Sequence, residues 1–307
     1  GPLSAVRHER VFSKEVAAQV RRIELRTRGL VESLFSGEYR SVFKGRGMEF
    51  SDVREYQPGD DVRAIDWNVT ARRGRPFVKE HIEERELTVL LIVDLSASKD
   101  FGTGTKTNAV IASEIAAILA LAATNNNDRV GLLLVTDRVE LFVPPDSGRR
   151  HALRLVIDIL SFRPAGRGTK LSQALEYAAR VLHRRTAVFL ISDFMMDDES
   201  DPVFVHDARR FSREHDLVPI RLSDPGTATL PDVGLLSLAD PETGLRHIVN
   251  TGDERVRRQY AERRAAKRSA MDTLFRELRL DVIEVSSAED YVLPLIVFFR
   301  RRERVTR

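Results

Sequence analysis

Two short stretches of the chain are apolar at every position and end at an acidic residue. The first is Val89 to Val93, which ends at Asp94, and the second is Ala187 to Ile191, which leads through one serine to Asp193. A strand that is apolar on both faces is typical of the centre of a parallel sheet covered by helices on both sides. We therefore predict that both stretches are central strands.

Segments with helical spacing of apolar positions alternate with these strands and with further strand-like runs. We expect helices at 109–123, 149–160, 171–183, 204–215 and 253–278, and a last helix that reaches Arg302. We expect further strands at 129–136, 217–222 and 281–285, an edge strand at 139–143, and a hairpin insertion near 232–250. Alternating strands and helices predict an α/β fold with a doubly wound, mostly parallel sheet flanked by helices.

The first 87 residues follow a different pattern. Val16, Val20 and Ile23 recur at helical spacing, which predicts an amphipathic helix over about 11–28. Between residues 37 and 72, glycines, aromatics and alternating charges favour short strands and tight turns over helix. We therefore expect an N-terminal helix and loop/β extension over 1–87, followed by one α/β domain over 88–307.

Acidic residues and the single tryptophan stand out in this extension. Asp60, Asp61 and Asp66 lie among several arginines. One alternative is a second metal site, but acids interleaved with arginines more often form internal ion pairs that fix a loop-rich segment. We expect ion pairs here, and we expect Trp67 to be a core anchor.

Side chains that carry oxygen atoms gather where the central strands end. Asp94, Ser96 and Ser98 form a D-x-S-x-S turn, Thr169 lies in a Gly-rich loop that opens a helix, and Asp193 ends the second strand. Open α/β sheets bind ligands beyond the carboxyl ends of their strands, and carboxylate and hydroxyl oxygens suit hard divalent cations. The pattern indicates a site for Mg²⁺, or for Mn²⁺ or Ca²⁺. Alternatively, the serines cap the next helix and Asp94 accepts hydrogen bonds from loop amides.

In this order, the five residues resemble the metal-ion-dependent adhesion site (MIDAS) of von Willebrand factor A domains. The run Gly-Asp-Asp-x-Arg-x-Ile-Asp-Trp at 59–67 resembles the signature of the bacterial domain-of-unknown-function family 58, where it precedes such a domain. The resemblance implies that the hydroxyls of Ser96, Ser98 and Thr169 contact the metal. It also implies that Asp94 and Asp193 hold the waters of the metal, and that an Asp or Glu of a protein partner takes the open coordination position.

The same resemblance implies a non-enzymatic protein-protein interaction module. The usual associate in this family is a MoxR-type AAA+ ATPase, which implies an adaptor or chaperone-like partner of such an ATPase. Where the resembling domains commonly have Met after the second Ser and often Asp after the Thr, this chain has Lys99 and Lys170. We expect both lysines at the rim of the site, where they would attract an acidic partner segment.

Composition excludes several classes of function. The 49 basic residues face 46 acidic ones, so the net charge of +3 gives no general case for nucleic acid. The absence of cysteine excludes disulfides and thiolate metal sites, and it fits a cytoplasmic protein. No apolar run approaches the ~20 residues that a membrane span needs.

Two alternative functions stay open at this point. Residues 102–107 lie where a phosphate-binding loop would, which allows a Mg-dependent enzyme acting on phosphoesters or nucleotides. A Walker loop, however, needs Gly immediately before its Lys, and Thr105 stands there. Residues 254–268 carry seven basic side chains and suggest nucleic-acid binding, although dense arginine on a helix is more often a solvated face.

Overall fold

The computed structural model describes residues 53–79, 87–96, 108–166, 168–196, 200–239 and 246–306, together with part of the segment from Lys14 to Leu25. Ser98 and Lys99 lie outside the described residues. None of the helices in these ranges is long and apolar enough to cross a membrane.

A six-stranded sheet forms the centre of the main domain, with the strand order β10-β7-β6-β3-β4-β5. The strands are β3 (Thr88–Asp94), β4 (Arg129–Val135), β5 (Val139–Asp146), β6 (Ala187–Ser192), β7 (Asp216–Ser223) and β10 (Ile283–Ser286). All neighbours pair in parallel except β5, which closes one edge antiparallel to β4. The mostly parallel, doubly wound α/β fold predicted from the sequence is confirmed.

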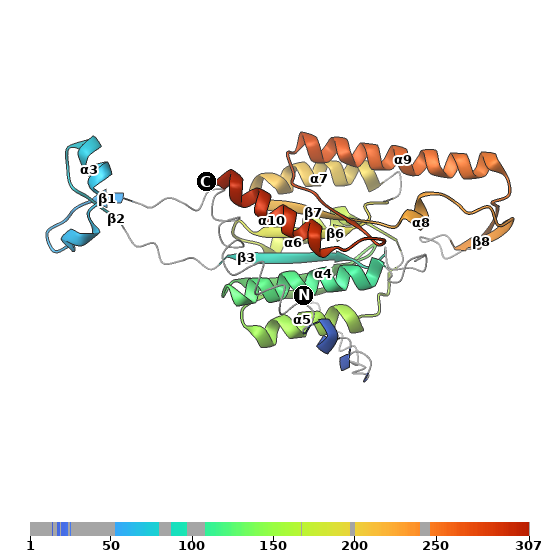
Figure 1. Cartoon of the computed structure of the whole chain (residues 1–307), viewed down its shortest axis with the longest axis horizontal. Coiled ribbons are helices and arrows are strands. Elements are labelled where there is room, and N and C mark those ends of the chain that lie inside the picture. The colour runs from blue at the N-terminus through green and yellow to red at the C-terminus, as the bar shows by residue number, and fades with distance from the viewer. Residues whose placement is uncertain are drawn as a thin grey trace.

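Alternate residues of β3 feed two separate hydrophobic cores. Val89, Leu91 and Val93 pack on one side and Leu90 and Ile92 on the other, and none of the five is more than 1% exposed. The first core is closed by α4 (Asn108–Asn125), α5 (Arg149–Ser161) and α10 (Val292–Thr306). The second is closed by α6 (Leu171–Val181), α7 (Ser200–Glu214) and α9 (Glu254–Glu277). Figure 1 shows α4 and α5 on one side of the sheet and α7 and α9 on the other.

The N-terminal helix packs on the outside of this domain. Its described residues between Lys14 and Leu25 are helical, as the spacing predicts. Ile23 is 4% exposed and lies in a small cluster with Ala117 of α4 and Val156 of α5. α4 therefore has apolar neighbours on its outer side as well as on the sheet, which explains why its sequence is apolar almost all round.

Two smaller β structures accompany the main sheet. A module at 53–79 contains β1 (Val53–Glu55), the 3₁₀ turn η1 (Val62–Ala64), α3 (Trp67–Arg73) and β2 (Phe77–Lys79). After β7, α8 (Pro225–Ala228) leads to a hairpin of β8 (Leu235–Ala239) and β9 (Arg246–Asn250), which precedes α9. Figure 1 shows the 53–79 module apart from the six-stranded sheet, and the hairpin at the end of the sheet where α8 lies.

The helix α3 corrects the expectation of strands and turns up to residue 72. Asp66 begins it, because its carboxylate accepts hydrogen bonds from the amides of Asn68 (3.0 Å) and Val69 (3.2 Å). Gly74 ends it in the left-handed region, with φ of 69°. The sequence contains both the capping Asp66 and the terminal Gly74, but the glycines and aromatic residues around them are more typical of strands and turns.

Of the three acidic residues expected to form ion pairs in this module, Asp60 pairs with an arginine, whereas Asp61 and Asp66 accept hydrogen bonds from backbone amides as caps. Both carboxylate oxygens of Asp60 accept hydrogen bonds from the guanidinium of Arg54, at 2.6 and 2.7 Å. The hydrogen bonds from Arg54 are the main reason that the pKa of Asp60 falls to about 2. Asp61 accepts from the amide of Arg63 at 2.9 Å and caps the 3₁₀ turn. These contacts favour structural roles over a second metal site.

The prediction that Trp67 is a core anchor is wrong. Its side chain is 69% exposed, whereas Val78 of the same module is only 3% exposed. Among the side chains described in this module only Val78 is buried, so little apolar surface is available there to cover an indole.

Candidate metal site

Three loops bring four of the five predicted oxygen donors together at the carboxyl edge of the sheet. Asp94 is 3% exposed and accepts a hydrogen bond from the amide of Ser96 at 2.9 Å. The hydroxyl of Ser96 contacts both the Asp94 carboxylate and the hydroxyl of Thr169. The half-buried Asp193 lies close enough for its charge to act on Asp94. The fifth donor, Ser98, lies outside the described residues.

The two carboxylates lack full compensation for their charge. Burial raises the pKa of Asp94 to about 6, the charge of Asp193 adds to this rise, and hydrogen bonds from Ser192 and Ser96 oppose it. Burial also raises the pKa of Asp193, against the Met195 amide (2.9 Å) and the positive charge of Arg264. A divalent cation between these groups would neutralise the charge that burial disfavours.

The donor set fits a hard cation. Asp94, Ser96, Thr169 and Asp193 offer only oxygen atoms, which are the ligands that Mg²⁺ and Ca²⁺ prefer. Within the described ranges, no group of three or more His, Cys, Asp or Glu could hold a metal. A metal at this edge of the sheet therefore depends on the hydroxyls as well as on the two acids.

Ser192 supports Asp94 and was not identified from the sequence. Its hydroxyl is fully buried, donates to the second oxygen of Asp94 at 2.6 Å and accepts from the amide of Phe194 at 3.0 Å. Asp94 thus has a hydrogen-bond partner on each oxygen, which fixes the orientation of its carboxylate. Ser192 ends a wholly apolar strand, and nothing in its local pattern points to a residue 98 positions away.

A second unpredicted network positions the loop that carries Thr169. Glu140 accepts hydrogen bonds from the amide of Gly166 (2.6 Å) and from the hydroxyl of Thr136 (2.8 Å). The Thr136 carbonyl accepts from the amide of Lys170 at 3.0 Å. A Cβ atom on Gly166 would lie 2.0 Å from the Thr136 hydroxyl, so this close approach requires glycine.

The two lysines predicted at the rim differ in what the structure describes. Lys170 is exposed and directly precedes α6, one residue after Thr169. Its side chain is therefore available to an approaching partner at the edge of the site. Lys99 lies outside the described residues, so its position stays a prediction.

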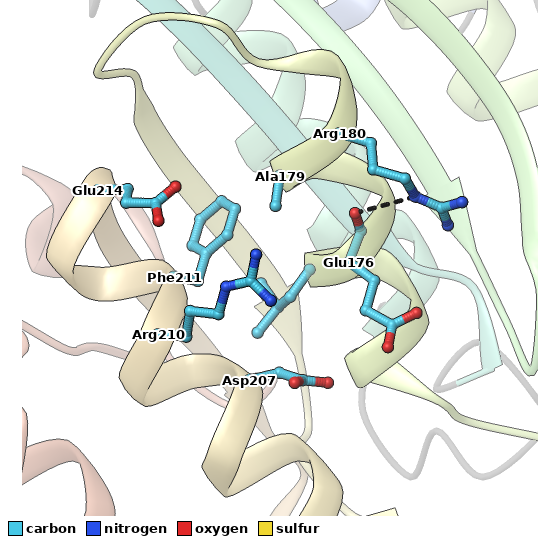
Figure 2. A pocket seen from close by; sticks show the side chains of 8 residues that line it. Glu176, Ala179, Arg180, Asp207, Arg210, Phe211 and Glu214 are labelled. Carbon is cyan, nitrogen blue, oxygen red and sulfur yellow. Dashed lines mark hydrogen bonds between the residues drawn. The ribbon is translucent and has the colours of Figure 1, made fainter.

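A separate groove of about 290 Å³ lies between α6 and α7, away from these donors (Figure 2). It is lined by Leu175, Glu176, Ala179, Arg180, Asp207, Arg210, Phe211 and Glu214. Figure 2 shows Arg180 directed along its own helix, where its guanidinium donates to the carbonyl of Glu176 at 3.4 Å. The groove contains none of the oxygen donors, so it is not part of the candidate metal site.

A doubly wound sheet whose central strand ends in D-x-S-x-S, with Thr169 and Asp193 at the same edge, defines a von Willebrand factor A-like domain. Residues 52–270 match the family model "Protein of unknown function DUF58", and the chain belongs to this family.

Relatives in mycobacteria share most of the chain. The uncharacterized protein Rv1480 of Mycobacterium tuberculosis is 31% identical over 293 residues, which cover 94% of this chain and 90% of the relative. The uncharacterized protein MAV169 of Mycobacterium avium is 27% identical over 165 residues, which cover 53% of this chain and 94% of the relative.

Solved structures with related folds have low sequence identity. The conserved hypothetical protein BatB from Bacteroides thetaiotaomicron has a TM-score of 0.46 and 14% identity, over 71% of this chain and 99% of that chain. The SpRpn10 VWA domain has a TM-score of 0.39 and 12% identity, over 69% of this chain and 93% of that chain.

Proposed function

We propose that the protein is a metal-dependent protein-protein interaction module. The observation that carries this proposal is the convergence of Asp94, Ser96, Thr169 and Asp193 from three separate loops at one edge of the sheet. Capping alone does not explain this arrangement, since Ser96 contacts a hydroxyl 73 residues away. The metal is Mg²⁺ or a similar dication, and Ser98 completes the set of hydroxyls.

The charged and the neutral residues of the site have different roles. Asp94 and Asp193 would hold a cation through its waters, and the neutral hydroxyls of Ser96 and Thr169 would serve as its ligands. When bound, the cation supplies an open coordination position that attracts a carboxylate. Neutral ligands leave more of the positive charge available to that carboxylate than anionic ligands would.

The partner supplies an acidic residue to this position. Lys170 stands exposed beside Thr169, and Lys99 follows Ser98 in the sequence. Positive charges at the rim weaken metal binding in the absence of the partner and attract an acidic segment toward the site. Partner binding should therefore depend on metal and on salt concentration.

We assign the partner to the MoxR-type AAA+ ATPases, for which the protein acts as an adaptor or chaperone-like subunit in the cytoplasm. The assignment rests on the resemblance of residues 59–67 to the family signature, which implies such an ATPase as the usual associate. We expect the ATPase to bind at the edge of the sheet that carries the candidate metal site, where a bound cation would attract a carboxylate.

The two alternative functions have less support. Basic side chains of α9 form hydrogen bonds within the protein. Arg257 donates to the Thr251 carbonyl at 2.6 Å, and Lys267 donates to the Met196 carbonyl. Fewer basic side chains are therefore available to contact a nucleic-acid backbone than the sequence suggests. For the enzyme alternative, Thr105 stands where a Walker loop needs Gly, and the phosphate-loop candidate at 102–107 lies outside the described residues.

The test is binding of a purified MoxR-type ATPase from the same organism to the immobilised protein, measured with the wild type and with Ser96→Ala plus Ser98→Ala. Ser147→Ala, an exposed serine between β5 and α5, is the matched control. The proposal expects the double variant to lose binding and the control to keep it. Equal binding by all three proteins would overturn the proposal.

A further inference from the structure

The β8–β9 hairpin presents large apolar side chains to solvent on one face. Leu235 pairs with Asn250 and Ser237 pairs with Ile248, so Leu235 and Ile248 lie on the same face of the hairpin. Their side chains are 73% and 74% exposed, and Val233 just before the hairpin is 60% exposed. Clustered apolar groups of this size on a surface mark interaction sites more often than isolated ones do.

The base of the hairpin is held in a fixed position. Thr251 is fully buried, and its amide and hydroxyl both donate to the carbonyl of Gly234, each at 2.7 Å. The same hydroxyl accepts from the amide of Val233 at 3.2 Å, and Arg257 of α9 donates to the Thr251 carbonyl at 2.6 Å. A surface ordered before binding loses less entropy when a partner binds.

The helix α9 connects this hairpin to the candidate metal site. Arg264 donates to the hydroxyl of Thr227 in α8, just ahead of the hairpin, at 3.3 Å, and its charge also acts on Asp193. Lys267 donates to the carbonyl of Met196 in the loop that follows Asp193. Figure 1 shows α8 and β8 together at one end of the main domain, beyond the sheet. The hairpin and the loops that carry the donors of the candidate metal site therefore belong to one continuous edge of the molecule.

The charge of this edge indicates the chemistry of its partner. Residues 254–268 contain seven basic and two acidic side chains. Several of the basic ones are exposed along the helix, namely Arg255, Arg258, Arg263 and Arg268. An exposed aliphatic hairpin face, followed in the chain by a helix with exposed arginines, complements a protein segment that carries both acidic and apolar side chains.

We propose that the Leu235–Ile248 face and the exposed arginines at the start of α9 form a second docking surface for the partner that reaches the metal site. Its occupant is an acidic segment of that partner with interspersed apolar side chains. This proposal rests on the proposed function, because it assigns both contacts to one partner. Aliphatic side chains on the hairpin favour a protein over a nucleic acid, whose bases stack on aromatic groups.

The experiment uses two probes: the purified ATPase described above, and a short labelled peptide of alternating Asp and Leu. The hairpin variant is Leu235→Ser with Ile248→Ser, and the charge variant is Arg255→Glu with Arg258→Glu. The matched control is Leu293→Ser with Val297→Ser, because these α10 side chains are 61% and 55% exposed at a different place in the fold. Circular dichroism confirms that each variant is folded.

We expect the hairpin variant to weaken the binding of both probes by about tenfold or more, since it removes apolar surface that the bound segment would bury. The charge variant should slow association and reduce its salt dependence. If the peptide responds to these variants and the ATPase does not bind the wild type, the surface stands and the assigned partner is wrong. If neither probe distinguishes the hairpin variant from the α10 control, or if single-stranded DNA displaces the peptide as well as unlabelled peptide does, the docking proposal is overturned.

Discussion

Replacing Asp94 by Asn should stabilise the metal-free protein at neutral pH and abolish metal binding. Burial, with a contribution from the charge of Asp193, raises the pKa of Asp94 from its ordinary 3.8 to about 6. Each tenfold change in proton affinity is about 1.4 kcal/mol, so the ionised carboxylate opposes folding by about 3 kcal/mol at neutral pH. An Asn side chain removes the charge, still accepts from the Ser96 amide, and donates to the hydroxyl of Ser192.

The gain in stability of the Asp94→Asn variant should depend on pH in a defined direction. Because the pKa is higher in the folded state, the protonated carboxyl of Asp94 favours folding. Its contribution is fully present below the ordinary pKa of 3.8 and is lost as the pH rises through about 6. Asn lacks this titration, so the two proteins should have similar stability near the lower value and diverge above it, with the variant more stable.

Urea unfolding in the presence of a chelator, repeated across this pH range, measures the effect. Asp224→Asn is the control, because Asp224 is also buried and caps α8 through the amide of Gly226 at 2.9 Å. With Mg²⁺ in place of chelator, the wild type should gain stability and the Asp94 variant should not. A variant that is less stable than the wild type in chelator at neutral pH would refute the electrostatic reasoning.

Stabilisation by Mg²⁺ should fade as the pH falls through about 6, because Asp94 must release its proton to face a cation, and thermal unfolding with and without metal measures this. Trp67→Ala should lower the free energy of unfolding by less than about 1 kcal/mol, because the indole is 69% exposed; a loss of about 3 kcal/mol in urea would restore a core role. Gly166→Ala should weaken metal affinity in calorimetry while the fold persists, because the added Cβ displaces the metal loop. Arg302→Ala should cost about 3–5 kcal/mol in urea unfolding, because it removes the buried guanidinium that pairs with the buried Asp216 at 2.7 Å, whereas Arg301→Ala, whose exposed guanidinium pairs with Asp281 at 3.3 Å, should cost less than about 1 kcal/mol; equal losses would contradict this.

The strands and the main helices could be predicted because their signals are local. The run Val89 to Val93 is apolar on both faces because helices cover both faces of β3. Burial on both faces can therefore be predicted from the consecutive apolar residues. The metal-site residues were recognisable for a similar reason. Carboxyl ends of parallel strands share one edge of the sheet, so Asp94 and Asp193 were expected at that edge, and the pairing of β3 with β6 in the structure brings the two strand ends together.

Features that depend on distant parts of the chain could not be predicted. The exposure of Trp67 depends on what lies beside a short helix and not on the helix itself. Ser192 supports Asp94 through a contact between two strands. The direction of Arg264 follows from the packing of α9, in which Met271 and Leu274 enter the core and turn one side of a basic helix toward the metal loops.

Calorimetric titration of Mg²⁺ into the wild type and into Ser96→Ala plus Ser98→Ala tests the central claim most directly. Both proteins should give the same circular dichroism spectrum, since Ser96 lies at the edge of the sheet and belongs to neither hydrophobic core. We predict that the wild type binds one cation and that the double variant shows no binding in the same concentration range. Equal affinity in the two proteins would contradict the assignment of Asp94, Ser96, Thr169 and Asp193 as a metal site.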